Sequence, residues 1–223
     1  MTKTFRLTTL AAMLAAASFG SHAAETADLA VKGTIRPSAC NVSISGNGVV
    51  NYGTISAVTL AEDAATALDP VVVSMTITCD AATRVALSTA DNRTGTANSA
   101  AGRVLVNYGP SWAGLGNADG QALGAYTIRL GPSSGMQATG DGEVVRSIYS
   151  HNLTSWTASG DGYSIHGIRS FSWAAPDTTE PAAYTTIVQQ IGVQAAIAPK
   201  SQLPSLTGGV QLDGNVTFTL LYL

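Results

Sequence analysis

The chain has 223 residues, only 11% of them charged, and its eleven Lys and Arg against fourteen Asp and Glu give a net charge of -3. Lys and Arg form no cluster, which argues against a nucleic acid partner. The composition is 45% hydrophobic and includes 23 Gly. Together with frequent Thr, Ser and Val, this favours strands joined by tight turns, as in an all-β sandwich or barrel.

The first residues have the pattern of an export signal. Lys3 and Arg6 give a positive start, an apolar run extends from Leu7 to Phe19, and Ser21 and Ala23 are small residues that a signal peptidase accepts. The run is too short to span a bilayer, and no later stretch is long enough. We therefore predict a signal peptide over residues 1–23, an exported protein and no transmembrane segment.

The chain has two cysteines, Cys40 and Cys79. In an exported protein the oxidising compartment favours a disulfide between them. Two thiols without a nearby pair of histidines would supply at most half of a zinc site, so a metal is the weaker alternative. We predict a disulfide, no metal and no other cofactor.

Alternating apolar residues predict strands through most of the chain. In order, the expected strands cover residues 29–35, 42–44, 49–52, 71–79, 85–88, 103–108, 126–130, 143–149, 168–173, 185–197 and 210–222. The Ala-rich stretch from Ala57 to Asp69 suits a helical turn, and residues 133–162 are rich in turn formers. No long window has a helical period, so we expect a single immunoglobulin-like β-sandwich.

The chain stops in the strand pattern GNVTFTLLYL. One face of this strand would carry Val216, Phe218, Leu220 and Tyr222. Chain ends usually fray unless something holds them. A terminal strand this apolar therefore needs a partner that covers it.

Three motifs resemble those of pilin subunits of the chaperone-usher pathway. They are KGTIRPSAC from Lys32 to Cys40, VNYGTI from Val50 to Ile55, and the penultimate Tyr222. The chain is most similar to the uncharacterised fimbrial-like exported proteins of Gram-negative bacteria. The resemblance covers both ends of the mature chain, whereas residues 90–165 match ordinary pilins poorly.

The resemblance implies a pilin-type sandwich that lacks its final strand and is completed by a donor strand. A periplasmic chaperone would fill the open groove first, an outer-membrane usher would receive the complex, and the N-terminal arm of another pilus subunit would then replace the chaperone strand. The expected function is that of a structural fimbrial subunit or fimbrial-like protein, without enzymatic activity. It would pass through the periplasm to the fimbrium at the cell surface.

By position, the resemblance assigns roles to two sets of residues. The chaperone-contacting strand and groove wall would be Val216, Phe218, Leu220 and Tyr222, and the donor arm would be Ala27, Leu29, Val31 and Gly33. The expected domains are the donor arm with the start of the first strand, residues 24–36, and a pilin-like domain, residues 37–223, with an enlarged Gly-rich middle at about 107–165. The arm is shorter than is typical of pilins.

The enlarged middle leaves alternatives open. Trp112 and Trp156 would contact a ligand if the protein were a tip-type adhesin or glycan-binding module, and otherwise they pack under a long loop. Gly131 to Gly135 matches the G-x-S-x-G nucleophile motif at Ser133, but turn residues follow it, so a turn is the better interpretation. His151 and His166 have no metal-ligand spacing.

Overall fold

The computed structural model describes residues 27, 29–34, 39–107, 111–160, 162 and 169–223. The chain divides into two compact units, Met1–Arg36 and Pro37–Leu223, and we call the second unit the body. The predicted signal peptide lies outside the described residues. Among the described residues, no helix has the length and apolar character needed to cross a membrane.

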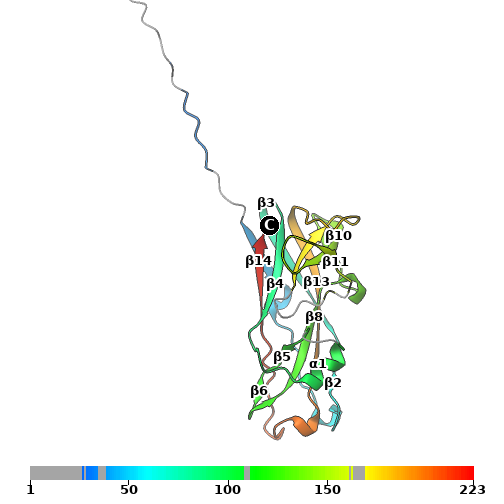
Figure 1. The fold of residues 1–223 in the computed structure, drawn as a ribbon. Helices are drawn as coiled ribbons and strands as arrows, with labels where there is room; N and C mark the ends of the chain where they lie inside the picture. The colour runs from blue at the N-terminus through cyan, green and yellow to red at the C-terminus, as the bar shows by residue number, and fades with distance from the viewer. Residues whose placement is uncertain (1–26, 28, 35–38, 108–110, 161, 163–168) are drawn as a thin grey trace, which may run out of the picture. The chain divides into compact units, whose positions relative to one another are not determined.

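Strands are the main secondary structure of the body, which confirms the all-β prediction (Figure 1). The strands are β1 Cys40–Ile44, β2 Thr66–Ala67, β3 Val71–Thr83, β4 Val85–Asp91, β5 Ala113–Gly114, β6 Asn117–Ala118, β7 Gln121–Ala122, β8 Gly124–Arg129, β9 Ala138–Gly140, β10 Glu143–Ser150, β11 Thr157–Ala158, β12 Ser170–Ala174, β13 Tyr184–Ile197 and β14 Val216–Tyr222. The helical segments are α1 Ser99–Leu105 and four short 3-10 turns, η1 Ser45–Gly48, η2 Ala57–Thr59, η3 Pro132–Ser134 and η4 Lys200–Gln202.

The main sheet runs in the order β1-β3-β13-β9-β10-β12-β4-β14, and its strand pairs are antiparallel. The long strand β13 also pairs with β8 and β2 along its second half. Strands β1 and β14 are therefore the two ends of the described sheet. In Figure 1 the elements α1, β5, β6 and β8 lie at the end of the body away from the C-terminus.

The core lies between the folded-over halves of this sheet. Its largest fully buried side chains include Trp173 and Phe171 from β12 and Met75 and Ile77 from β3. The indole N–H of Trp173 donates to Gln189 Oε1 at 2.9 Å, so the polar atom of the buried ring is satisfied. The alternation seen in the sequence of β3 is thus the alternation of a strand with one buried face.

One predicted strand is wrong. Residues 103–105 belong to α1, because Asn98 caps this helix through its side-chain oxygen, which accepts from the backbone N–H groups of Ala100 and Ala101. The cap and the small residues that follow outweigh the short apolar run, which periodicity alone cannot assign. Tyr108 lies outside the described residues.

Three further predicted strands differ from the structure. Residues 49–52, 210–215 and 29–34 are not in strands. The first two segments flank the groove described below and have no main-chain ladder beside them. Leu29 and Val31 in the third segment are 90% and 91% exposed. A strand needs a partner strand, and these segments have none among the described residues.

Candidate strand-binding groove

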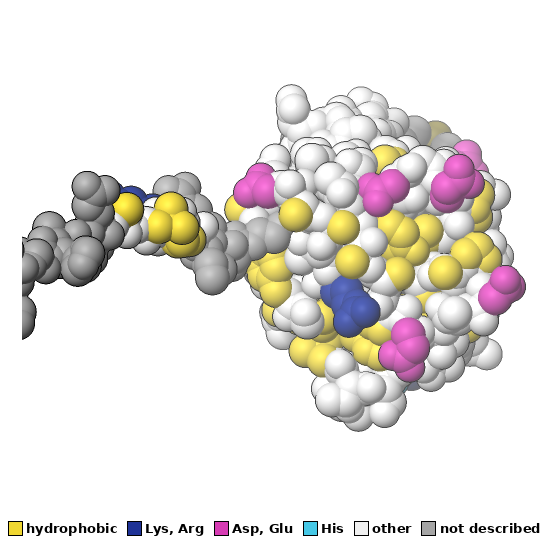
Figure 2. Space-filling model, turned by 90° about the horizontal axis from the view of Figure 1, so that it is seen from above, with side chains coloured by type: hydrophobic (Ala, Val, Ile, Leu, Met, Phe, Trp, Pro, Cys, Tyr) yellow, Lys and Arg dark blue, Asp and Glu magenta, His cyan; other side chains and the backbone are white. Residues whose placement is uncertain are grey.

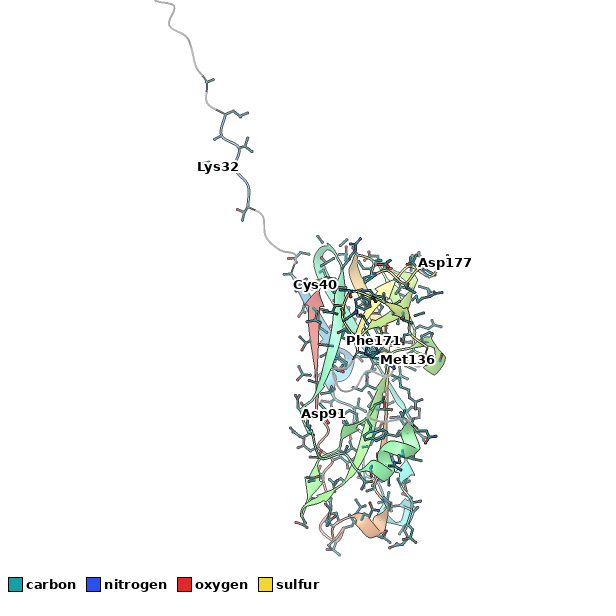
Figure 3. The ribbon with its side chains drawn as sticks, in the orientation of Figure 1. Lys32, Cys40, Asp91, Met136, Phe171 and Asp177 are labelled. Carbon is teal, nitrogen blue, oxygen red and sulfur yellow. A yellow bond between two sulfur atoms is a disulfide. The ribbon has the colours of Figure 1, made fainter. Side chains whose placement is uncertain are left out.

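The predicted disulfide is present between Cys40 and Cys79. The two residues face each other across the β1–β3 pair, with their Cα atoms 4.0 Å apart. Figure 3 shows Cys40 at the end of the body where β14 ends. The disulfide therefore fixes the start of β1, one of the two end strands of the sheet.

Both end strands direct main-chain groups away from the strand with which they pair. The N–H of Asp80 donates to Ala39 O, and because hydrogen-bonded and non-hydrogen-bonded pairs alternate, the main-chain groups of Cys40, Val42 and Ile44 point away from β3. On β14, Leu223 N–H donates to Arg84 O. By the same alternation, the outward residues there are Val216, Phe218, Leu220 and Tyr222. Each edge could therefore hold another strand.

A cavity of about 720 Å³, lined mainly by apolar residues, lies between extensions of these two end strands. One wall is Ile44, Gly48 and residues 50–57, which follow β1. The other wall is residues 209–212 and 214–216 with Phe218, which lead into β14. The floor includes Tyr126, Ile128, Ile191 and Val193. We call this cavity the groove.

The first wall is held in place by Tyr52. Its hydroxyl donates to Val193 O at 3.1 Å and accepts from Ala195 N–H at 3.1 Å, so a single side chain is bonded twice to the main chain of β13. Burial raises the pKa of Tyr52, and the hydrogen bond from Ala195 opposes that rise. Tyr52 therefore anchors residues 49–55 without a strand ladder.

The second wall is held by Asp213. Its N–H donates to Leu115 O at 2.9 Å, and its carboxylate accepts from Arg93 Nη2 at 2.7 Å and Nε at 2.8 Å. The hydrogen bond from the Arg93 guanidinium lowers the pKa of Asp213. The bidentate ion pair with Arg93 keeps residues 209–215 beside the groove just before β14 begins.

The floor contains a buried hydroxyl. Tyr126 is 6% exposed, and its oxygen has no hydrogen-bond partner in the described part of the body. Burial is the largest cause of its raised pKa, and the nearby Asp91 carboxylate adds to it. Gly214 lies over this ring, where a side chain would press on it.

The structure separates the four predicted residues of the last strand into two pairs. Val216 and Phe218 line the groove, whereas Leu220 and Tyr222 lie beyond its lining. Tyr222 is 55% exposed, and its hydroxyl accepts from Cys40 N–H at 2.9 Å. The groove is thus open beside the start of β14 and bridged near its end.

The predicted arm residues Ala27, Leu29, Val31 and Gly33 are all exposed. They belong to the first unit, Met1–Arg36. Their apolar side chains have no cover among the described residues. Their role as a donor strand stays a prediction.

The two loop tryptophans differ in their surroundings. Trp112 packs with Ala101 and Leu105 of α1 in a second apolar cluster, so its contacts are those of a packing residue. Trp156 lines a smaller cavity of about 370 Å³ together with Arg84 and Glu180. A ring beside charged groups suits a sugar, and ligand contact at Trp156 stays a prediction.

The remaining sequence motifs hold no assembled site within the described residues. Ser133 lies in the turn η3, as expected, and its N–H donates to Gly160 O. His151 stacks edge-on against Tyr149, while His166 lies outside the described residues. The described part of the chain contains no cluster of three or more His, Cys, Asp or Glu that could hold a metal ion.

Surface charge gives little to attract an anionic partner. Figure 2 looks onto the end of the body where β14 ends; most of this face is polar side chains and backbone, with separate apolar groups, scattered acidic groups and few basic ones.

Comparison with known proteins places the chain. The family described as "Protein of unknown function (DUF1120)" matches residues 29–127. Protein GltF of Escherichia coli (strain K12) is 30% identical over 257 aligned residues, which cover 97% of this chain and 98% of GltF. The chain belongs to the same family as GltF. Uncharacterized protein YhcF of the same organism is 25% identical, with 95% of this chain and 98% of YhcF covered.

The sequence patterns point to Val216 and Phe218 of the groove wall but not to the other residues that build the walls. Tyr52 is part of the VNYGTI motif, and Gly214 opens the last apolar segment, yet neither was given a role. The available signal was the sequence itself, in which the last apolar segment begins well before Val216. Tyr126 could not be placed, because its position in the floor depends on the pairing of β8 with the second half of β13.

Proposed function

We propose that this protein is an exported structural subunit of a fimbrium or a fimbrial-like assembly, built by exchange of β-strands between polypeptides. A periplasmic chaperone supplies the first strand, an outer-membrane usher receives the complex, and the arm of another subunit supplies the final strand. The observation that carries the proposal is the groove, lined mainly by apolar residues, between extensions of two end strands. Apart from Cys40 N–H, the outward main-chain groups of these two strands pair with no further strand among the described residues.

Strand addition uses this geometry directly. Main-chain hydrogen bonds to the outward residues of β14 hold the added strand, and the apolar cavity takes alternate side chains. An apolar edge left unfilled is an aggregation hazard, which is why a chaperone would be needed before assembly.

The length of the arm suits this edge. Strand β14 has seven residues. The arm stretch from Ala27 to Gly33 also has seven residues, with Leu29 and Val31 two positions apart on one face. The short arm is therefore long enough to pair with the whole of β14.

The test uses one arm substitution and its neighbour. Val31 is 91% exposed, so Val31→Asp should leave the body folded while placing a charge where the proposal needs an apolar side chain. We expect the purified mature V31D chain to lose self-assembly, measured by size-exclusion chromatography with light scattering. Lys32→Asp, one residue along on the opposite face, changes the net charge more and should assemble normally.

A second measurement separates assembly from folding. The V31D chain should still take up a labelled synthetic peptide of residues 24–36, because its groove is intact. Equal assembly of V31D and K32D would contradict the proposal. So would a wild-type chain that neither assembles nor takes up the peptide.

A further inference from the structure

The two edges that flank the groove are joined at one point. Cys40 and Tyr222 are 182 residues apart in the sequence, and Cys40 N–H donates to the Tyr222 hydroxyl at 2.9 Å. Cys40 N–H is one of the outward main-chain donors of β1 described above. A side chain of one end strand thus occupies a main-chain hydrogen-bonding group of the other.

This contact coincides with the closed end of the groove. The lining includes Ile44 of β1 with Val216 and Phe218 of β14, but neither Cys40 and Val42 nor Leu220 and Tyr222. Neighbouring strands lie about 4.8 Å apart, so a strand inserted between two edges needs them about 9.6 Å apart over its whole length. The Tyr222 bridge stands across that path at one end.

We infer that Tyr222 is a clasp that controls access of an incoming strand to the full length of β14. Its hydroxyl accepts from Cys40 N–H. Without this bond, Cys40 N–H could donate to a main-chain carbonyl of the entering strand. The strand can enter beside Val216 and Phe218, and it completes its pairing only when the hydroxyl is displaced. This inference rests on the proposed strand exchange and adds the residue that opposes it.

Thermodynamic linkage predicts how removal of the Tyr222 hydroxyl changes the affinity for the incoming strand. The hydroxyl stabilises only the empty protein, because in the filled protein a carbonyl takes its place. Removing it should therefore strengthen strand binding. The net free energy of a solvent-exposed neutral hydrogen bond is small. Its loss should therefore lower the dissociation constant of the incoming strand by about two- to tenfold.

The test compares a mature chain that is wild type at position 222 with Tyr222→Phe, which keeps the ring. Every protein in this test also carries Val31→Asp, so that it does not assemble and its groove is empty. The probe is the labelled peptide of residues 24–36, and binding is measured by fluorescence anisotropy. We expect tighter binding by Y222F in the range above. Tyr184→Phe is the matched control, because Tyr184 lies on β13 outside the groove lining, and its binding should equal that of the wild type.

Amide hydrogen exchange at Cys40 gives a second, independent readout. In the empty wild-type protein this amide should be protected, and in empty Y222F it should exchange faster. After peptide uptake it should be protected in both proteins. If Tyr222 only supported the fold, peptide uptake would not restore protection of the Cys40 amide in Y222F.

The outcomes are distinct. Equal peptide affinity of the wild type and Y222F, or a Cys40 amide that exchanges alike in both empty proteins, would overturn the clasp and leave strand exchange standing. Peptide uptake by none of the three proteins would overturn both proposals.

Discussion

The buried hydroxyl of Tyr126 is unusual because nothing nearby accepts its proton. The oxygen lies in the floor of the groove without a hydrogen-bond partner among the described residues. A buried polar group that makes no hydrogen bond lowers stability. Ionisation would be worse still, since burial and the Asp91 carboxylate both oppose a second negative charge there.

We predict that Tyr126→Phe has a free energy of unfolding at pH 7 equal to or greater than that of the wild type. The folded pKa of Tyr126 is raised above the ordinary 10.0, so the folded state keeps its proton longer than the unfolded state. The wild type should therefore lose stability as the pH rises past 10, and Y126F should lose less. Urea unfolding at pH 7, 10 and 11 measures this.

Tyr52 also has a raised pKa, so part of the alkaline loss should remain in Y126F. If both proteins lost stability with the same slope above pH 10, the burial assigned to the Tyr126 hydroxyl would be wrong.

At the scale of elements, α1 shows how packing reverses an intrinsic preference. Alanine usually stabilises a helix relative to glycine by about 1 kcal/mol. In α1, however, a Cβ atom on Gly102 would overlap the indole of Trp112. Gly102 is therefore required by the close approach of Trp112 and is not a weakness in the helix.

We predict that Gly102→Ala lowers the free energy of unfolding, by about 1 to 3 kcal/mol, because the ring or the helix must move. Val104→Ala in the same helix is the control: Val104 is 52% exposed, and its substitution should change stability by less than about 0.5 kcal/mol. Chemical denaturation of the three proteins is the measurement. A more stable G102A would show that Trp112 does not pack as described.

The sequence predicted those elements whose signal is local. The alternation in β3 and β13, the apolar last strand and the disulfide partners were all readable, because a strand with one buried face repeats every two residues. The strand predicted at residues 103–105 is wrong, since a short apolar run does not distinguish helix from strand and the Asn98 side chain caps a helix there. The hydrogen bond between Tyr222 and Cys40 could not be predicted from the sequence, because it joins residues that are 182 positions apart.

At the scale of the whole molecule, the proposed donor and acceptor surfaces are different parts of the chain. The exposed arm residues belong to the first unit, and the groove belongs to the body. Contacts between unlike surfaces are heterologous, so the proposed assembly extends into an open chain of subunits where the contacts do not close into a ring or a reciprocal dimer. Each assembly would then have one end with an unfilled groove and one with an unused arm.

We predict that a mature chain lacking residues 24–36 stays monomeric but adds to growing assemblies. It keeps the groove and can accept an arm, yet it cannot donate one. Adding it at a tenth of the wild-type concentration should shorten the assemblies, as measured by light scattering. The same truncated chain carrying Phe218→Asp should have no such effect, and shortening by both proteins would argue against the groove as the acceptor.

The disulfide determines how a linked subunit would bear load. A pull on the first unit enters the body immediately before Cys40, the first residue of β1. Because Cys40 is covalently joined to Cys79, tension is transmitted at that point to β3, and β1 cannot be peeled from its end. Strand β3 pairs with β13 from Val71 to Thr78, so the disulfide passes the load from β1 to that ladder, where it is shared by many hydrogen bonds.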